Sequence, residues 1–357
     1  MEEKVDCKNQ NTDISENSCF LRACKGLHTN FTPIWLMRQA GRYMKEYRDL
    51  RAKVSFIDLC KNSDLACEVT VTAAREIGVD AAIIFSDILL ILQPMGFQIT
   101  YDEGVGPQIH NPVKESKDVE AILDFDVKSE LSYVFDAIKK VRSELNNTIP
   151  LIGFSGAPFT LASYLIEGGG SKNFVKTKRF MYKEKNAWNR LMENFTKSLS
   201  NYLTSQIEAG AQALQIFDSW VGCLSRSDYR EYVMPHMKIL LNSISKRVPV
   251  IHFGTGTSAF LEDMKEAGGD VIGLDFRVDL IDAWNRLGDI PVQGNLDPCI
   301  LFSDKDLIAK KAAEILEAVN MRPGYIFNLG HGVLPETPVD NVKYLVDFVH
   351  EWRVKNQ

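Results

Sequence analysis

Residues 33–51 of the chain read Pro-Ile-Trp-Leu-Met-Arg-Gln-Ala-Gly-Arg-Tyr-Met-Lys-Glu-Tyr-Arg-Asp-Leu-Arg. The stretch begins with a short apolar run, Ile34–Met37, and then becomes strongly basic. Its basic part carries five cations against two acids: Arg38, Arg42, Lys45, Arg48 and Arg51 against Glu46 and Asp49. Because arginine stays charged and forks onto carboxylate or phosphate, the stretch indicates a buried strand that leads into an anion site. The alternative on composition alone is a salt-bridged amphipathic helix on the surface.

The composition is that of an ordinary globular protein. Of 357 residues, 45% are hydrophobic and 25% charged, and the net charge of −6 argues against general nucleic-acid binding. No apolar run approaches the roughly 20 residues that span a bilayer. Residues 1–17 are polar and lack the apolar core of a signal peptide. We therefore expect a flexible tail over residues 1–19, a single domain over residues 20–357 and a cytoplasmic location.

The seven cysteines give no sign of a disulfide framework or a zinc knuckle. Their number is odd, and no two of them form a C-x-x-C pair. This usage is typical of reduced thiols in the cytosol.

Short apolar runs recur along the chain, and each is followed by a polar or glycine-rich turn and a helical pattern. The runs are Ile34–Met37, Ala81–Phe85, Leu151–Phe154, Ala213–Phe217, Val250–Phe253, Val271–Leu274, Pro291–Gln293 and Tyr325–Asn328. Several are continuously apolar, which is typical of parallel strands buried on both faces. Eight strands alternating with helices predict an α/β fold, a single (β/α)8 TIM-type barrel. No G-x-G-x-x-G follows the first strand, which counts against a dinucleotide-binding fold.

Local signals refine this prediction. Residues 96–109 predict a β-hairpin inserted after the second strand. Asn62 and Gly78 have the character of the N-cap and C-cap of one long helix. Near the end of the chain, Thr337 is expected as an N-cap and Pro338 as the first residue of the last helix.

The C-terminal ends of barrel strands are where function is expected. The polar side chains that the sequence places there are Arg38 and Arg42 after the first strand, Asp87 after the second, Ser219 after the fourth, Asp275 after the sixth and His331 after the eighth. One rim of the barrel is therefore expected to carry cations, carboxylates and a histidine, separated by wide glycine turns.

Each of these residues has a structural alternative. Asp87 lies between apolar residues, which favours function, although it could cap the following helix. His331 lies between two glycines, which favours access for a ligand over a structural role. For Asp275, a helix cap and a functional carboxylate are equal alternatives. For His252 we favour a structural role.

Two familiar chemistries do not fit the motifs. The segment around Ser155 lacks the G-x-S-x-G spacing of a nucleophilic serine. A zinc site of the H-x-C kind would need a thiolate where Gly254 follows His252 by two residues, and no cysteine stands near His331.

Four longer motifs can be compared with known families. Residues 33–43, 83–89, 153–169 and 328–338 resemble, in order, motifs of the uroporphyrinogen decarboxylases, and the resemblance runs from about Phe20 to Arg353. It implies a single-domain (β/α)8 barrel that removes CO2 from the four acetate side chains of uroporphyrinogen III, giving coproporphyrinogen III in haem biosynthesis. It also implies a homodimer that uses no metal or prosthetic group.

The resemblance implies roles for individual residues. Arg38, Arg42 and Arg51 match arginines that bind substrate carboxylates, and Asp87 matches the aspartate that accepts hydrogen bonds from the pyrrole N–H groups. Further polar residues of the cleft are matched by Tyr164, Ser219 and His331. The catalytic set implied is Asp87, Arg38, Tyr164 and His331.

The chemistry explains why such residues are needed. Loss of CO2 from an acetate leaves a carbanion, and a protonated pyrrole can take up its electrons. Our hypothesis is that Asp87 stabilises that cation in a dry cleft. Arg38 would hold the departing carboxylate or deliver a proton, with Tyr164, His331 and an ordered water as competing donors. A substrate with eight carboxylates also accounts for a positive rim on an acidic protein.

Two other functions remain as alternatives. A zinc-dependent corrinoid or thiol methyltransferase of the same barrel superfamily would need cysteines where this chain has Gly254 and His331. A porphyrin-binding or scaffold protein would not need the whole set of polar cleft residues.

Overall fold

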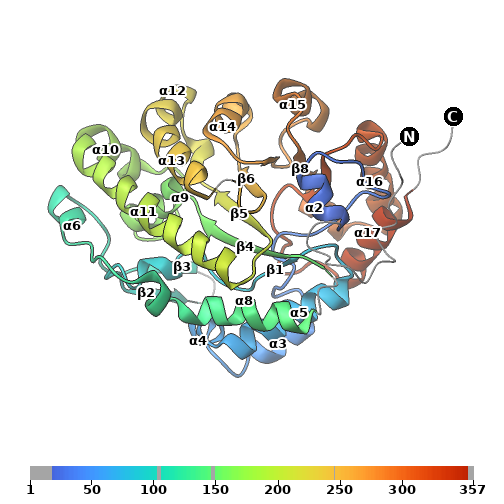
Figure 1. The fold of residues 1–357 in the computed structure, drawn as a ribbon, viewed down its shortest axis with the longest axis horizontal. Helices are drawn as coiled ribbons and strands as arrows, with labels where there is room; N and C mark the ends of the chain where they lie inside the picture. The colour runs from blue at the N-terminus through green and yellow to red at the C-terminus, as the bar shows by residue number, and fades with distance from the viewer. Residues whose placement is uncertain (1–17, 103–105, 146–148, 245, 353–357) are drawn as a thin grey trace.

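The computed structural model describes residues 18–102, 106–145, 149–244 and 246–352. Within these residues seven parallel strands form one curled sheet in the order β1-β4-β5-β6-β7-β8-β9 (Figure 1). Their bounds are β1 Ala82–Ile83, β4 Leu151–Gly156, β5 Ala213–Asp218, β6 Val250–Gly254, β7 Val271–Gly273, β8 Val292–Leu296 and β9 Tyr325–Leu329. Because sheet neighbours are also successive strands of the main sheet, the connections are those of a barrel, and the predicted fold class is confirmed.

The segment expected as the first strand occupies the eighth position without forming a regular strand. Ile34 makes one parallel bridge to β9, and its carbonyl accepts a hydrogen bond from the N–H of Asp80 at 2.8 Å. Beside β1, the side-chain amide of Gln39 takes over the pairing: it donates to the carbonyl of Ala81 and accepts from the N–H of Ile83, both at 3.2 Å. The prediction of a regular first strand is therefore wrong, because a side chain supplies the hydrogen bonds that strand backbone supplies elsewhere.

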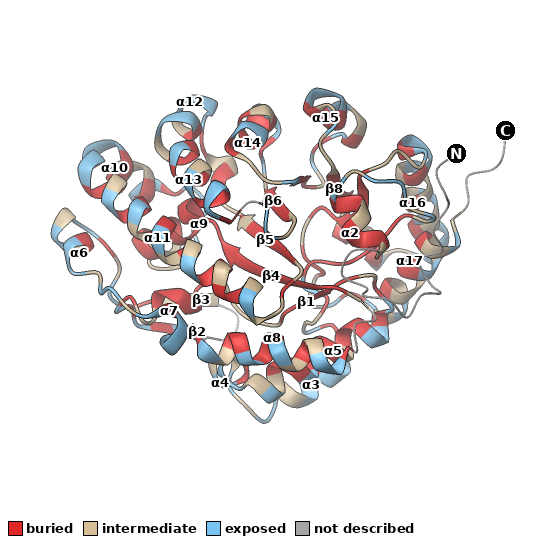
Figure 2. Ribbon diagram, viewed as in Figure 1, coloured by how far each residue is buried: buried red, intermediate tan, exposed pale blue. Residues whose placement is uncertain are grey.

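Helices cover the outside of the sheet and turn their buried faces towards it (Figure 2). The α-helices are α2 Cys19–Cys24, α3 Lys45–Arg51, α4 Phe56–Lys61, α5 Ser63–Ile77, α6 Ser116–Glu120, α7 Val127–Glu130, α8 Ser132–Glu144, α9 Pro158–Glu167, α10 Val175–Lys183, α11 Lys185–Ala209, α12 Arg226–Asp228, α13 Met234–Ile244, α14 Leu261–Ala267, α15 Leu280–Leu287, α16 Lys305–Val319 and α17 Val339–Glu351. Short 3-10 helices span Leu90–Leu92, Val221–Cys223, Ser258–Phe260 and Pro298–Phe302, and a π-helix spans Tyr229–Val233.

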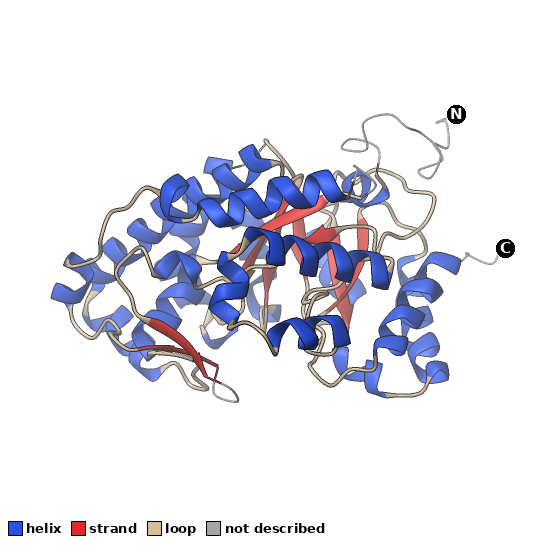
Figure 3. Ribbon diagram, turned by 90° about the horizontal axis from the view of Figure 1, so that it is seen from below, coloured by secondary structure: helices blue, strands red, loops and turns tan. Residues whose placement is uncertain are grey.

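The predicted hairpin is present. Strands β2 (Ile99–Asp102) and β3 (Gly106–Ile109) pair antiparallel, apart from the barrel strands (Figure 3). The hairpin is fixed to the end of α9: Gln108 bridges to Gly169, and the N–H of Ile109 donates to the carbonyl of Gly168 at 2.9 Å. Gly169 has φ +157°, and a Cβ there would lie 2.9 Å from the carbonyl oxygen of Pro107. A glycine is therefore needed for this close approach.

The predicted ends of two helices have different outcomes. The caps of α5 are confirmed: the side chain of Asn62 accepts hydrogen bonds from two backbone N–H groups, and Gly78 has a left-handed conformation. For α17 the prediction is wrong by one residue, because Pro338 is the N-cap and Val339 the first helical residue. Thr337 is buried, and its hydroxyl has no hydrogen-bond partner among the described residues, so it caps nothing.

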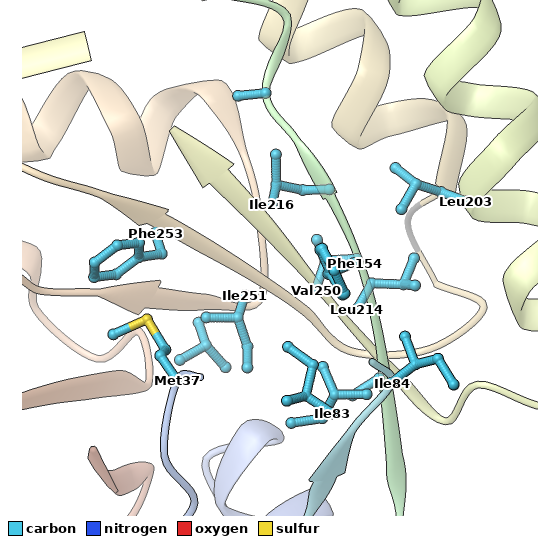
Figure 4. Close-up of a cluster of buried hydrophobic side chains, with 14 of the residues drawn as sticks. Met37, Ile83, Ile84, Phe154, Leu203, Leu214, Ile216, Val250, Ile251 and Phe253 are labelled. Atoms are coloured by element: carbon cyan, nitrogen blue, oxygen red, sulfur yellow. The ribbon is translucent and has the colours of Figure 1, made fainter. Parts of the chain in front are cut away.

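The barrel interior is mostly apolar, and Figure 4 shows part of this packing around Met37, Ile83 and Ile251. A short polar chain crosses it: the indole of Trp35 donates to Gln293 at 2.8 Å, and Gln293 donates to Gln215 at 3.0 Å. These hydrogen bonds link Trp35, in the segment that was expected as the first strand, to β8 and β5. It thereby stabilises the position from which Arg38 projects.

Candidate active site

Arg38 follows the segment that fills the eighth barrel position. Its backbone has φ 61°, a left-handed conformation that is uncommon for a residue with a side chain and is often found at functional sites. Its exposed side chain lies against Gly332, where a Cβ would come within 2.5 Å of the Arg38 Cδ. Gly332 therefore leaves the space through which the arginine reaches the mouth of the barrel.

Asp87 lies in the turn after β1. Its Oδ1 accepts hydrogen bonds from the N–H of Leu89 at 2.8 Å and from the hydroxyl of Tyr101 at 2.5 Å. Burial raises the pKa of Asp87, and the hydrogen bonds from Tyr101 and Leu89 and the charge of Arg38 partly offset that rise. Asp87 does not cap the next helix, the 3-10 helix Leu90–Leu92, whose N-cap is Leu89 without a side-chain cap; its carboxylate stabilises the preceding turn and lies within electrostatic range of Arg38.

His331 follows β9 between two glycines, and each glycine has a steric reason. A Cβ on Gly330 would lie 2.1 Å from the backbone N of Phe276, and a Cβ on Gly332 would meet Arg38. The loop after β7 and the Arg38 side chain can therefore both approach the imidazole. Burial lowers the pKa of His331, and the charges of Arg38 and Arg277 lower it further.

Tyr164 and Ser219 belong to neighbouring parts of the rim. Burial and the nearby Asp87 raise the pKa of Tyr164 to about 12, so its phenol keeps its proton at neutral pH. The Tyr164 ring packs edge-on against Trp220, with 5.6 Å between ring centroids. Ser219, at the end of β5, is half-buried, and its backbone carbonyl accepts a hydrogen bond from the Thr255 hydroxyl.

The cations of residues 38–51 divide into two groups. Arg38 and Arg42 are exposed and have no carboxylate within ion-pair distance among the residues that the structure describes. Arg48 donates to the backbone carbonyls of residues 42 and 43 at 2.8 and 2.7 Å, so it supports the turn. Lys45 pairs with Asp49 on the exposed face of α3. Both interpretations of the basic stretch are therefore correct in part. Lys45 and Asp49 form a salt bridge on a surface helix, whereas Arg38 and Arg42 are unpaired cations suited to an anion site.

Arg51 lies at the other end of α3. Its guanidinium donates to the carbonyl of Val54 and lies over the Phe56 ring, 5.8 Å from the centroid. The Phe56 ring lies 4.7 Å from that of Tyr101, which hydrogen-bonds Asp87. Arg51 is thus separated from Asp87 by two aromatic rings.

Asp275, which the sequence left open, and His252, for which it favoured a structural role, both have structural partners. Asp275 is fully buried and accepts hydrogen bonds from the N–H of Gly256 at 2.5 Å and from the Arg277 guanidinium at 3.0 Å. It therefore joins the turns after β6 and β7. His252 is buried on β6, where one ring nitrogen lies 3.3 Å from the carbonyl oxygen of Gly268. A structural role is the simplest interpretation of both.

The structure brings Arg38, Asp87 and Tyr164 within electrostatic range of one another, and it brings His331 within range of Arg38. Sequence reasoning missed two neighbours of this group, Tyr101 and Arg277. The alternation in β2 of buried Ile99, exposed Thr100 and half-buried Tyr101 could have indicated that the tyrosine faces inward.

A metal-binding cluster and a membrane-spanning helix are both absent from the described residues. In the part of the chain that the structure describes, no three His, Cys, Asp or Glu side chains are grouped so that they could hold a metal ion. Among the same residues, no helix is long and apolar enough to cross a bilayer.

Comparison with known proteins decides the family. The model of the uroporphyrinogen decarboxylase family matches residues 15–352. The chain belongs to the uroporphyrinogen decarboxylase family. It is 52% identical to the uroporphyrinogen decarboxylase of Carboxydothermus hydrogenoformans over 337 residues, covering 94% of this chain and 96% of that protein. It is 49% identical to the enzyme of the same name from Thermus thermophilus, covering 94% and 98%.

A solved structure shares the fold at lower sequence identity. A methyltransferase from Methanosarcina mazei superposes with a TM-score of 0.79 over 95% of this chain and 98% of that protein, at 20% identity. At 20% identity this similarity supports only the barrel fold. The predicted fold and family are thus confirmed, and the methyltransferase alternative gains no support over the decarboxylase.

Proposed function

We propose that this chain removes CO2 from each of the four acetate side chains of uroporphyrinogen III, giving coproporphyrinogen III. The observation that carries the proposal is the juxtaposition of a half-buried carboxylate, Asp87, and the unpaired arginine Arg38. Relatives about half identical in sequence bear the name of this activity.

Substrate binding is assigned to the cations of the rim. Arg38 and Arg42 have no protein carboxylate to neutralise them, and guanidinium groups bind carboxylates in a forked geometry. Arg51 is proposed to bind carboxylates further from Asp87. Ser219 is proposed to donate a hydrogen bond from its half-buried position at the end of β5.

Asp87 is proposed to accept hydrogen bonds from the pyrrole N–H groups of the substrate. Both hydrogen bonds that the described residues make to its carboxylate use Oδ1, so Oδ2 is available to the substrate. When a pyrrole is protonated, a fixed anion stabilises the cation that will accept the electrons released with CO2. Burial of the carboxylate strengthens that attraction.

Two protein groups, Tyr164 and His331, and a water bound to Arg38 compete as proton donors. Tyr164 keeps its proton at neutral pH, because its pKa is raised to about 12. His331 is mainly neutral at pH 7, because its pKa is lowered by burial and by Arg38 and Arg277. A neutral imidazole donates a hydrogen bond more readily than a proton, so we assign His331 to holding the substrate and Tyr164 or an Arg38-bound water to proton delivery.

We further propose that residues 20–357 act as one unit, that the protein is cytoplasmic and does not bind nucleic acid, and that it is a homodimer. Cys24, Cys60, Cys67, Cys223 and Cys299 are free thiols, as expected in a reducing compartment. Multi-angle light scattering of the purified full chain tests the assembly. We expect twice the chain mass of 40.3 kDa, and the mass of a single chain would contradict it.

The activity is tested by turnover under anaerobic conditions. Purified protein with excess chelator is mixed with uroporphyrinogen, and the products are oxidised and separated by chromatography according to carboxyl number. We expect species with seven, six, five and finally four carboxyl groups. A strict requirement for added zinc would favour the methyltransferase alternative, and binding without turnover would favour a porphyrin-binding protein.

A further inference from the structure

The hairpin β2–β3 contributes a side chain to the cleft that the family resemblance did not indicate. Tyr101, on β2, is half-buried, and its hydroxyl donates a hydrogen bond of 2.5 Å to the Oδ1 of Asp87. The other hydrogen bond to this oxygen comes from the N–H of Leu89, in the turn that also carries Asp87. Tyr101 is thus the contact to Asp87 that depends on an inserted element.

The position of Tyr101 is fixed from two sides. Its ring packs on Phe56 of α4, with 4.7 Å between centroids. The far strand of the hairpin is joined to the end of α9 by the Gln108–Gly169 bridge and by the hydrogen bond from Ile109 to Gly168. Since α9 also carries Tyr164, this attachment joins the two elements that bear Tyr101 and Tyr164.

We propose that Tyr101 is a positioning residue for the decarboxylation: its hydroxyl holds Oδ1 of Asp87 against the protein and leaves Oδ2 to meet the pyrrole N–H groups. This inference rests on the proposed function. A carboxylate that is free to rotate would present either oxygen, or neither, to the macrocycle, whereas a carboxylate held at one oxygen presents the other at a fixed place.

The hydrogen bond also favours the charged form of Asp87. Burial raises the pKa of this carboxyl, and Tyr101 is the first of the groups that offset the rise. The other titratable or charged groups within electrostatic range of Asp87 are Arg38, Cys60 of α4, Tyr164 of α9 and Tyr202 of α11. Only Arg38 among these carries a charge at neutral pH, so removal of the Tyr101 hydroxyl leaves Arg38 and the Leu89 N–H as the remaining stabilisers of the anion.

The test is Tyr101→Phe, which keeps the ring that packs on Phe56. We expect kcat/KM at neutral pH to fall roughly tenfold, and the acid limb of its pH profile to move up by about one pH unit, as expected for loss of one hydrogen bond to a charged group. The matched control is Tyr182→Phe, which removes a tyrosine hydroxyl bonded to Asp228 at 2.9 Å on the exposed face of α10. The control should leave rate and profile unchanged.

Two results would overturn the proposal. One is a Tyr101→Phe profile that coincides with that of the wild type. The other is a larger loss of rate with an unmoved acid limb, which would make Tyr101 a proton donor instead.

A measurement without substrate separates this inference from the proposed function. In protein labelled with carbon-13 at the aspartate carboxyl, the Asp87 signal is assigned by its loss in Asp87→Asn. Its pKa should be about one unit higher in Tyr101→Phe than in the wild type, whether or not the protein decarboxylates uroporphyrinogen. An unchanged pKa contradicts the hydrogen bond, whereas a wild type without turnover contradicts only the function.

Discussion

The contact between Arg38 and Gly332 allows a sharp test of how the site is positioned. Gly332→Ala adds a single methyl group, which would lie 2.5 Å from Cδ and 2.6 Å from Cγ of Arg38. Carbon atoms in contact lie about 3.5–4.0 Å apart, so the arginine has to move by about 1 Å or more. The backbone of Gly332 is not in the left-handed region that penalises alanine, so the fold should persist.

The size of the effect follows from that displacement. A misplacement of about 1 Å in a catalytic constellation can cost on the order of a hundredfold in rate. We therefore expect kcat/KM of Gly332→Ala to fall about 100-fold, or roughly 3 kcal/mol in transition-state free energy. Within this loss, KM should rise because Arg38 is proposed to bind a substrate carboxylate, and kcat should fall because the proposed place of that carboxylate is beside Asp87.

The assay measures initial rates of anaerobic loss of CO2 from uroporphyrinogen at several substrate concentrations. Gly170→Ala is the matched control, since a Cβ at Gly170 meets no atom within 4 Å. Thermal denaturation of both variants shows whether the fold is intact. A folded Gly332→Ala with kcat/KM within threefold of the wild type would refute the argument that Gly332 holds the place of Arg38.

Two further predictions concern charge. Arg42→Gln should raise KM about tenfold with little change in kcat, because an unpaired guanidinium is lost. Lys45→Gln, on the exposed face of α3, should change neither constant. Equal effects of the two substitutions would contradict the division of the basic stretch into two groups of cations. Burial raises the pKa of Asp218 to about 7, above the value of this carboxyl in the unfolded chain. The contribution of Asp218 to the stability of the fold is therefore full below about pH 4 and is lost as pH rises to about 7. The stability of Asp218→Asn relative to the wild type, measured by urea unfolding, should therefore rise between pH 5 and pH 8 by on the order of 3 kcal/mol, and a constant difference would contradict a raised pKa.

Much of the fold could be predicted because the signals are local or periodic. Continuous apolar runs such as Leu151–Phe154 indicate parallel strands, and Asn62 and Gly78 mark the ends of α5. A regular first strand was predicted but is not present, because the side chain of Gln39 pairs with the backbone beside β1. No local pattern shows that a side chain will take the place of a strand.

The rim residues were predictable because a barrel brings all its strand ends to one face. That rule places Arg38, Asp87 and His331 at one rim, and in the structure Arg38 lies within electrostatic range of both Asp87 and His331. It gives no help with side chains that arrive from insertions. Tyr101 reaches Asp87 only because the hairpin is docked on α9, and Asp275 is buried under hydrogen bonds from the turns after β6 and β7. Such tertiary contacts join residues far apart in the chain, and a single sequence does not encode them in a recognisable pattern.

The central claim is that the negative charge of Asp87 stabilises the cationic intermediate of decarboxylation. Asp87→Asn tests it most directly, because asparagine keeps the shape of the side chain and one oxygen acceptor while removing the charge. We expect kcat for uroporphyrinogen to fall by about 100-fold or more, while the affinity for the product, coproporphyrinogen, changes by only a few-fold. A kcat within threefold of the wild type, in a variant that is folded and binds the product, would contradict it.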